Sequence, residues 1–237
     1  RFKAASQCGF QAVEIQFPYS MKAEVIRDLL EENRLKLVLF NVDADDLLQQ
    51  GEGLAAVPEK QSRFREAILQ AVEYARILKP KAINVLPGCS FDAHKREIYL
   101  QTFLNNLELA LEAFSPLGIK TVFEAVNTFD MPVFIIHTSE QMLDILNRLQ
   151  HPNLYMQYDI YHMQMMGENV EAFIRQHADK IGHIQFADVP GRGQPGTGNI
   201  DLNRLFDAID QAGYNGWVGA EYKPTAPTGD TLSWLRT

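Results

Sequence analysis

Residues 154–186 read LYMQYDIYHMQMMGENVEAFIRQHADKIGHIQF. The stretch begins and ends with short runs of aliphatic, aromatic and β-branched residues, Leu154–Asp159 and Ile181–Phe186, which are typical of strands. Between them, residues 170–178 have the amphipathic pattern of a helix. A strand, a helix and a second strand in this order predict a right-handed βαβ unit with two parallel strands.

The same cycle recurs along the chain in both directions. Further strands are expected at residues 12–17, 36–41, 82–86, 120–124 and 216–221, and further helices at 21–33, 59–78, 95–114, 139–149 and 202–212. No linker, composition break or low-complexity segment interrupts the pattern, so we expect one domain over residues 1–237. The number of units favours an α/β fold of the (β/α)₈ TIM barrel type over an open doubly wound sheet.

The beginning of the chain departs from that pattern. Residues 1–8 have the character of the last turns of a helix, which Gly9 ends. Seven strands are therefore expected where a TIM barrel has eight, and the N-terminal first strand is the one without a counterpart. We expect the native protein to carry about 15–25 further residues before Arg1, enough for one strand and the start of a helix.

Glycine-rich stretches do not indicate a nucleotide site. A Rossmann sheet would need G-x-G-x-x-G after its first strand, and none is found there. Residues 191–198, GRGQPGTG, contain Pro195 and lack the Lys-Ser/Thr that follows in a P-loop. Their place after the seventh barrel strand suits a loop that contacts substrate, and an ordinary surface loop is the alternative.

Composition excludes several classes of protein. The 237 residues are 46% hydrophobic and 22% charged, as in a globular protein and unlike a collagen or a disordered chain. The net charge of -8 argues against nucleic acid as a partner. No stretch of about 18 apolar residues indicates a membrane span. Cys8 and Cys89 cannot form a disulfide framework and are typical of reduced thiols, so we expect a cytoplasmic protein.

Four polar residues occur near the carboxyl ends of successive expected strands: Glu124, Asp159, Gln185 and Glu221. Active sites of TIM barrels lie at this end of the strands, so the four side chains are expected to converge. Three carboxylates and an amide oxygen suit Mg²⁺ or Mn²⁺ better than zinc. The alternative is that each residue is merely a strand end or a helix cap.

Other residues are candidates for substrate binding. His162 follows Asp159 closely, and His183 shares a strand face with Gln185, so it either fills the barrel or supports the metal ligands. Arg192 lies in the loop after the seventh barrel strand, and Lys223 follows the last expected strand. Either cation would suit a substrate carboxylate, and a solvated surface charge is the alternative for each.

Several motifs carry a family resemblance. They are QYDIYHMQ at 157–164, DKIGHIQ at 179–185, PGTG at 195–198, GYNGWVGAEYKP at 213–224, and FQAVE at 10–14 followed by FPY at 17–19. In these motifs, which span nearly the whole chain, the sequence resembles the hydroxypyruvate isomerase family. That family is part of the xylose isomerase-like TIM barrels, which include ketose 3-epimerases and endonuclease IV.

The resemblance implies roles for the strand-end residues. Glu124 and Glu221 match the family's two metal-binding glutamates that serve as acid and base, and Asp159 and Gln185 match the remaining ligands. His162 matches a substrate-contacting histidine of the epimerases, whereas Gln185 stands where the epimerases have histidine. The implied reaction interconverts hydroxypyruvate and 2-hydroxy-3-oxopropanoate (tartronate semialdehyde), a step of glyoxylate metabolism, through an enediolate and with no organic cofactor.

Three alternatives stay open. A 2-oxo-tetronate isomerase, or a related sugar or keto-acid isomerase or epimerase, would use the same residues. A phosphodiesterase similar to endonuclease IV would need a histidine-rich three-zinc site and a basic groove, and the charge and the carboxylates argue against both. A barrel without catalytic activity is the third. We expect a small hydroxy-keto acid as the substrate and no association with membranes. A homo-oligomer is one of the oligomeric states that the sequence leaves open.

Overall fold

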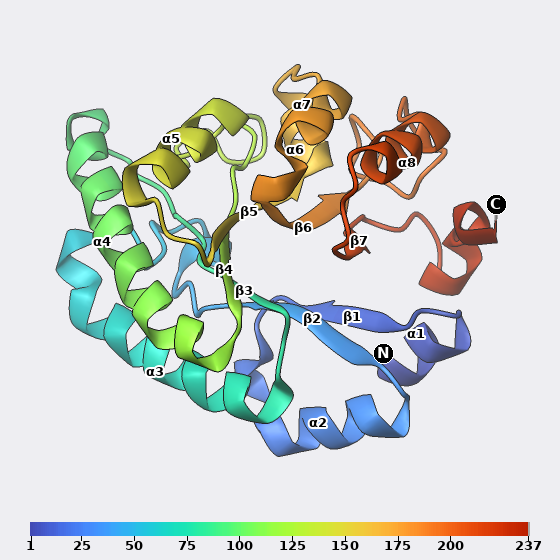
Figure 1. Ribbon diagram of the computed structural model, residues 1–237, viewed down its shortest axis with the longest axis horizontal. Coiled ribbons are helices and arrows are strands. Elements are labelled where there is room, and N and C mark those ends of the chain that lie inside the picture. The colour runs from blue at the N-terminus through green and yellow to red at the C-terminus, as the bar shows by residue number, and fades with distance from the viewer. Residues whose placement is uncertain (237) are drawn as a thin grey trace.

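The computed structural model describes residues 1–236, and its centre is a curved sheet of seven parallel strands joined by helices on the outside (Figure 1). The strands pair in chain order: β1 (Ala12–Ile15), β2 (Lys36–Asn41), β3 (Ala82–Asn84), β4 (Lys120–Phe123), β5 (Leu154–Asp159), β6 (Ile181–Phe186) and β7 (Val218–Ala220). This is a TIM barrel wall of seven strands, and the expected fold class and number of strands are confirmed.

Helices follow the strands and pack around the sheet. They are α1 (Phe2–Gln7), α2 (Ala23–Glu32), α3 (Gln61–Leu78), α4 (Arg96–Phe114), α5 (Ser139–Leu149), α6 (Ile160–Met165), α7 (Val170–His177) and α8 (Leu202–Gln211). The helices α2, α5, α7 and α8 are amphipathic and bury one face. The main apolar cluster lies between the strands and this ring of helices.

The inner face of the barrel has two layers, which follow from the side-chain period of two. Leu39, Ala82 and Val122 form an apolar layer and pack in one cluster. Asn41, Asn84 and Glu124, each two residues further along its strand, form the polar layer above them. The parallel register pairs Leu39 with Ala82 and Asn41 with Asn84, so each layer is continuous across the sheet.

One helix was not expected from the sequence. The short helix α6 follows β5 directly, because the Asp159 side chain caps it by accepting hydrogen bonds from the backbone N–H groups of Tyr161 and His162. His162 therefore lies on a helix and not in a loop. His137, just before α5, is also buried, and its Nδ1 lies 2.9 Å from the carbonyl oxygen of Val126.

The sheet does not close on itself among the residues that the structure describes. β1 and β7 are its two edges, and every residue of both strands is half-buried, whereas β2 to β6 are mostly buried. Figure 1 shows the two edges facing each other, and residues of both line a cavity of about 710 Å³. The strand expected before Arg1 stays a prediction.

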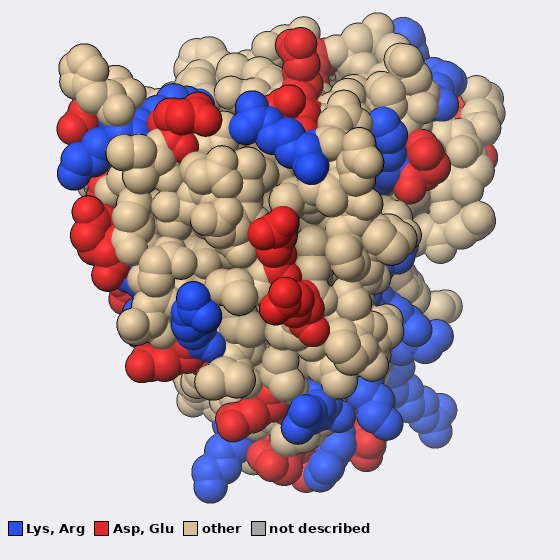
Figure 2. All heavy atoms as spheres, turned by 60° about the vertical axis from the view of Figure 1, so that its left-hand side comes forward, with Lys and Arg blue, Asp and Glu red and all other residues tan. Residues whose placement is uncertain are grey.

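Charges on the molecular surface are mixed. On the face drawn in Figure 2, Lys and Arg lie in the upper part as well as along the lower and right-hand edges, Asp and Glu lie among them and near the centre, and uncharged areas separate these groups. That face carries no continuous basic groove of the kind that follows a phosphate backbone. No helix within residues 1–236 is both long and apolar enough to cross a membrane.

Candidate active site

A cavity of about 150 Å³ lies where the carboxyl ends of the strands meet. Its polar lining residues are Glu14, Gln16, Asn41, Glu124, Asp130, Gln157, His162, Gln185, Arg192 and Glu221. Apolar side chains, among them Phe17, Leu47 and Phe134, complete the wall. The cavity holds both predicted acid/base glutamates and two of the predicted substrate-binding residues, in the position that the fold predicts for an active site.

Glu124 is a buried carboxylate of the cavity. It follows β4 directly, and only 7% of its surface is exposed. Its Oε1 accepts a hydrogen bond of 2.8 Å from Nδ2 of Asn84, which in turn donates to Oδ1 of Asn41 at 3.2 Å. Because these three residues end neighbouring strands, the backbone ladder of the sheet holds the carboxylate in place.

Glu221 reaches the same cavity from the other side of the sheet. Its side chain is 28% exposed, and Nε2 of Gln16 donates to its Oε1 at 2.5 Å. A guanidinium nitrogen of Arg192 donates to its Oε2 at 3.0 Å. The same Arg192 nitrogen is 3.6 Å from Oδ2 of Asp159, so one guanidinium links two of the carboxylates.

Both glutamates bind protons more tightly than isolated carboxylates do. Burial, followed by the charges of Glu221 and Asp159, raises the pKa of Glu124 from 4.5 to about 8. Burial, followed by the charge of Asp159, raises the pKa of Glu221 from 4.5 to about 7. Two carboxyl groups with pKa values near neutrality are suited to accept and return a proton at physiological pH.

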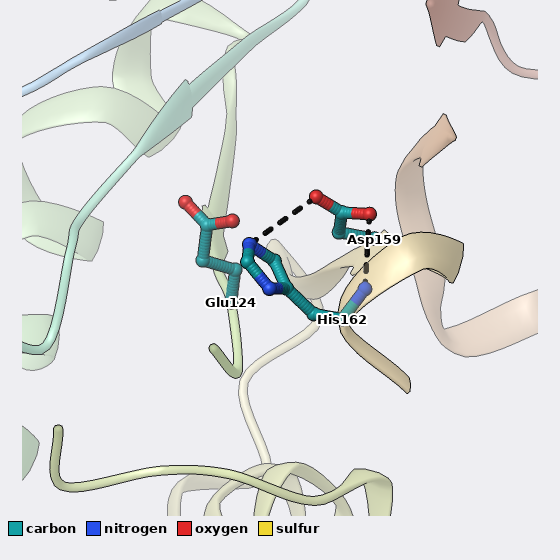
Figure 3. A group of neighbouring side chains, drawn as sticks. All are labelled: Glu124, Asp159 and His162. Carbon is teal, nitrogen blue, oxygen red and sulfur yellow. Dashed lines mark hydrogen bonds and ion pairs between the residues drawn. The ribbon is translucent and has the colours of Figure 1, made fainter. Parts of the chain in front are cut away.

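Asp159 and His162 stand next to Glu124 (Figure 3). One ligand atom from each of these three residues lies within 4.8 Å of the others, a spacing that a single cation can span. Figure 3 shows the two carboxylates and the imidazole ring pointing toward one another. Oδ2 of Asp159 is buried and accepts no hydrogen bond, so it has a free lone pair for a cation.

Gln185 is held by two neighbours, Gln157 and Glu14. Nε2 of Gln157 donates to its Oε1 at 2.6 Å, and its own Nε2 donates to Oε2 of Glu14 at 2.7 Å. The other oxygen of Glu14 lies 2.7 Å from Nε2 of His183. The amide oxygen of Gln185 therefore faces the cavity in a fixed orientation and keeps a second lone pair for a ligand.

Of the three expected carboxylate ligands, Glu124 and Asp159 belong to the group that could hold one cation, together with His162, whereas Glu221 is not part of that group. Glu221 and the amide of Gln185 line the cavity beside Glu124, so carboxylate and amide groups gather there. Carboxylate and amide oxygens are the ligands that Mg²⁺ and Mn²⁺ prefer. The raised pKa values of both glutamates, and the oxygen of Asp159 that accepts no hydrogen bond, are the signs of negative charge that a cation would neutralise.

The four substrate-binding candidates differ in position. His162 and Arg192 line the cavity, and Arg192 also lies over the ring of Tyr161, 5.2 Å from its centroid. His183 is buried beneath the cavity against Glu14. Lys223 is exposed, and its side chain is not among the lining residues, although its backbone N–H donates to the carbonyl oxygen of Arg192.

Several polar residues of the site were not singled out from the sequence. Glu14, Gln16 and Asn41 line the cavity, and Asn84 and Asn127 bind side chains that do. A signal for three of them was available, because Asn41 and Asn84 end short apolar strands and Glu14 interrupts one. The same strand-end reasoning that selected Glu124 applies to both asparagines.

Comparisons with known proteins agree with this geometry. A model of the family described as "Xylose isomerase-like TIM barrel" matches residues 2–237. Hydroxypyruvate isomerase of Escherichia coli is 40% identical over 235 residues, which cover 99% of this chain and 91% of that protein. The 2-oxo-tetronate isomerase of Pectobacterium atrosepticum is 37% identical over 234 residues, with coverage of 99% and 89%.

Solved structures give the same picture of the fold. A structure described as an AP endonuclease, family 2, from Brucella melitensis is 32% identical and superposes with a TM-score of 0.95, covering 100% of this chain and 91% of that one. A 3-keto-D-glucoside 4-epimerase from E. coli has a TM-score of 0.80 at 18% identity, with coverage of 99% and 92%. At that identity the second likeness concerns the fold alone.

Proposed function

The chain belongs to the xylose isomerase-like TIM barrel family and is an isomerase, and from this premise we propose that it interconverts hydroxypyruvate and 2-hydroxy-3-oxopropanoate. The observation that carries the proposal is the meeting of Glu124 and Glu221, both with raised pKa values, in one small cavity beside Arg192. Such a site offers two proton carriers and one cation to a short keto acid.

The reaction moves hydrogen between neighbouring carbon atoms. One glutamate removes a proton from the hydroxymethyl carbon of hydroxypyruvate, which gives an enediolate. The other returns a proton to the adjacent carbon, while the hydroxyl proton moves from one oxygen to the next. Positioned carboxylates of this kind accelerate such steps roughly 10²–10⁴-fold each. Because the two carbons exchange hydrogen internally, no redox cofactor takes part.

Other residues of the cavity bind and orient the substrate. Arg192 binds the substrate carboxylate, for which its planar guanidinium is suited. His162 donates a hydrogen bond to a substrate oxygen that becomes negative in the enediolate. His183 supports the site from below through Glu14, and Lys223 adds positive charge outside the cavity.

Glu124, Asp159, Gln185 and Glu221 would hold a divalent cation, Mg²⁺ or Mn²⁺. When bound, such an ion supplies positive charge beside the substrate oxygens and so makes the neighbouring C–H bond more acidic. The donor set supports this assignment, since it consists of oxygens, and Asp159 has a buried oxygen without a hydrogen-bond partner.

A second substrate has support of its own. A relative 37% identical to this chain is described as 2-oxo-tetronate isomerase, and its substrate is one carbon longer. The same proton transfer between adjacent carbons would serve both compounds. The half-exposed side chain of Glu221 indicates that one side of the cavity is open to solvent, where a longer chain would extend.

A substrate panel tests the proposal. The purified protein is stripped of metal with a chelator and assayed with hydroxypyruvate and with 2-oxo-tetronate, without and with added Mg²⁺ or Mn²⁺. We expect metal-dependent conversion of hydroxypyruvate to the semialdehyde, measured by a coupled reductase. Turnover of the tetronate alone would favour the second substrate, and inactivity on both with metal present would contradict the proposal.

A further inference from the structure

The Nδ1 atom of His162 faces two hydrogen-bond donors from one residue. The backbone N–H of Asn127 points at this nitrogen from 3.4 Å, and the side-chain Nδ2 of Asn127 lies 2.7 Å from it. A backbone N–H donates and never accepts. Nδ1 must therefore present its lone pair to Asn127, and it carries no hydrogen.

The amide of Asn127 is held in one orientation. Its Oδ1 accepts hydrogen bonds from the backbone N–H groups of Phe129 at 3.0 Å and Asp130 at 2.8 Å. Its Nδ2 also donates to Oδ2 of Asp130 at 2.9 Å. The reverse orientation would set the amide oxygen against a carboxylate and the NH₂ group against two N–H groups, so Nδ2 is the atom that faces His162.

These contacts determine where the imidazole carries its hydrogen. A doubly protonated ring would place its Nδ1–H against both donors of Asn127, and the nearest carboxylate oxygen, Oδ2 of Asp130, lies 4.0 Å away, beyond hydrogen-bond distance, so this geometry disfavours that form. A neutral ring with a lone pair on Nδ1 carries its hydrogen on Nε2. Nε2 lies 3.5 Å from Oδ2 of Asp159, and His162 lines the cavity.

We propose that Asn127 is a positioning residue that holds His162 as the Nε2–H tautomer, so that the ring donates a hydrogen bond into the cavity and does not bind the metal ion. A ring nitrogen that carries hydrogen has no lone pair for a cation. His162 therefore differs in role from Glu124 and Asp159, which can bind a cation, although all three residues offer atoms within 4.8 Å of one another. The role in the reaction rests on the proposed function, whereas the tautomer does not.

Nitrogen-15 NMR of histidine-labelled protein measures the tautomer directly. In the wild type we expect His162 to show a lone-pair signal for Nδ1 and an N–H signal for Nε2. Asn127→Asp, which has the same shape, sets a carboxylate oxygen against Nδ1 and should shift hydrogen onto that nitrogen. Asn105→Asp, at an exposed position of α4, is the matched control, because it makes the same substitution away from His162, so the wild-type signals should persist.

Kinetics and metal binding complete the test. Asn127→Asp should lower kcat by roughly 10–100-fold with KM changed less, as is usual for residues that orient a functional histidine. His162→Gln should leave the affinity for Mn²⁺ alone within about threefold of wild type, since the ring is not a ligand. A hydrogen on Nδ1 in the wild type, or a loss of Mn²⁺ affinity above about 100-fold in His162→Gln, would overturn the inference.

The wild-type spectrum alone decides the tautomer if Asn127→Asp fails to fold. The proposed function and the proposed role of Asn127 can also be contradicted independently of each other. If His162 has the expected tautomer but no keto acid is turned over, the proposed function is wrong and the tautomer assignment stands. If hydroxypyruvate is turned over and Nδ1 carries the hydrogen, the enzyme assignment stands and the role of Asn127 is wrong.

Discussion

The two sides of the barrel support their glutamates differently. Glu124 follows β4, a strand with partners on both sides, and it is bound by Asn84 of the neighbouring strand β3. Glu221 follows β7, an edge strand, and it is bound by the side chains of Gln16 and Arg192. The carboxylate of Glu124 is bound by a side chain from a strand that is paired on both sides, whereas that of Glu221 is bound by side chains from the end of an edge strand and from a loop.

Side chains also connect the edge strand β1 to β6, near the opposite end of the sheet. Glu14 of β1 binds His183 and Gln185 of β6, although β1 and β6 are not neighbours in the sheet. Gly219 of β7 lies against this contact, and a Cβ there would collide with the Glu14 carboxylate. The absence of a side chain at position 219 makes room for Glu14, so the edge region depends on individual side chains more than the paired strands do.

The largest expected effect separates the two glutamates. Glu124→Gln should lower kcat by roughly 10³–10⁴-fold, because it removes a buried proton carrier that no water can replace. Glu221→Gln should lower kcat by roughly 10²–10³-fold, since solvent reaches this half-exposed side chain and substitutes in part. Both rates are measured with hydroxypyruvate at saturating Mn²⁺.

Circular dichroism spectra and Mn²⁺ affinity serve as controls for folding and for metal loading in the two variants. Wild-type turnover in either variant would show that its acid/base role is wrong. A larger loss in Glu221→Gln than in Glu124→Gln would contradict the comparison between the two sides.

Much of the fold was predictable because local signals agree with the tertiary structure. Strand β5 and helix α5 have the expected bounds. The start of α5 is determined locally, by a capping box that Thr138 and Gln141 form. Helix α6 was missed, because its six residues directly follow a strand and carry no loop or turn signal. Its start depends on a cap from Asp159, a residue with a second role in the site.

The site was predictable to the extent that it depends on strand ends. Glu124 and Glu221 follow apolar strands and reach the cavity, as their positions in the sequence indicate. The position of Glu14 in a strand could be recognised, but its partners could not be predicted, because His183 and Gln185 lie about 170 residues away in the sequence. Nor could the sequence indicate the hydrogen bond between Asn127 and His162, which depends on the loop after β4.

A second prediction concerns Arg192, whose guanidinium group binds Glu221. Arg192→Met should raise KM for hydroxypyruvate by roughly 10–100-fold, which corresponds to the loss of a charge-assisted hydrogen bond to the substrate carboxylate. Lys223→Met is the matched variant, and its effect on KM should be smaller because this side chain is exposed and outside the cavity lining. Equal effects would show that the carboxylate binds elsewhere.

A third prediction concerns the bridge across the sheet edge. Glu14→Ala leaves the buried Nε2 atoms of His183 and Gln185 without their acceptor, so the free energy of unfolding should fall by about 1–3 kcal/mol. Urea denaturation measures this change. Glu31→Ala, on the exposed face of α2, is the control and should change stability by less than about 0.5 kcal/mol. An equal effect in both variants would mean that the bridge contributes nothing to stability.

The last prediction concerns the pH dependence of stability in metal-free protein. Burial and neighbouring carboxylates raise the pKa of Glu124 to about 8 and that of Glu221 to about 7 in the folded state, against 4.5 ordinarily. A raised pKa in the folded state means that folding favours the protonated group. The stabilisation is complete below pH 4.5 and is lost as the pH rises through 7 and 8.

The melting temperature of metal-free protein should therefore fall between pH 5 and pH 8.5, by roughly 2–4 °C for each kcal/mol lost. Glu124→Gln should flatten this slope more than Glu221→Gln does, because the glutamate on the paired side of the barrel is more deeply buried. Saturating Mn²⁺ should flatten it in the wild type, since a cation replaces the protons. A slope that is unchanged in Glu124→Gln would show that this carboxyl group titrates normally, and the difference between the two sides would then be one of geometry and not of proton affinity.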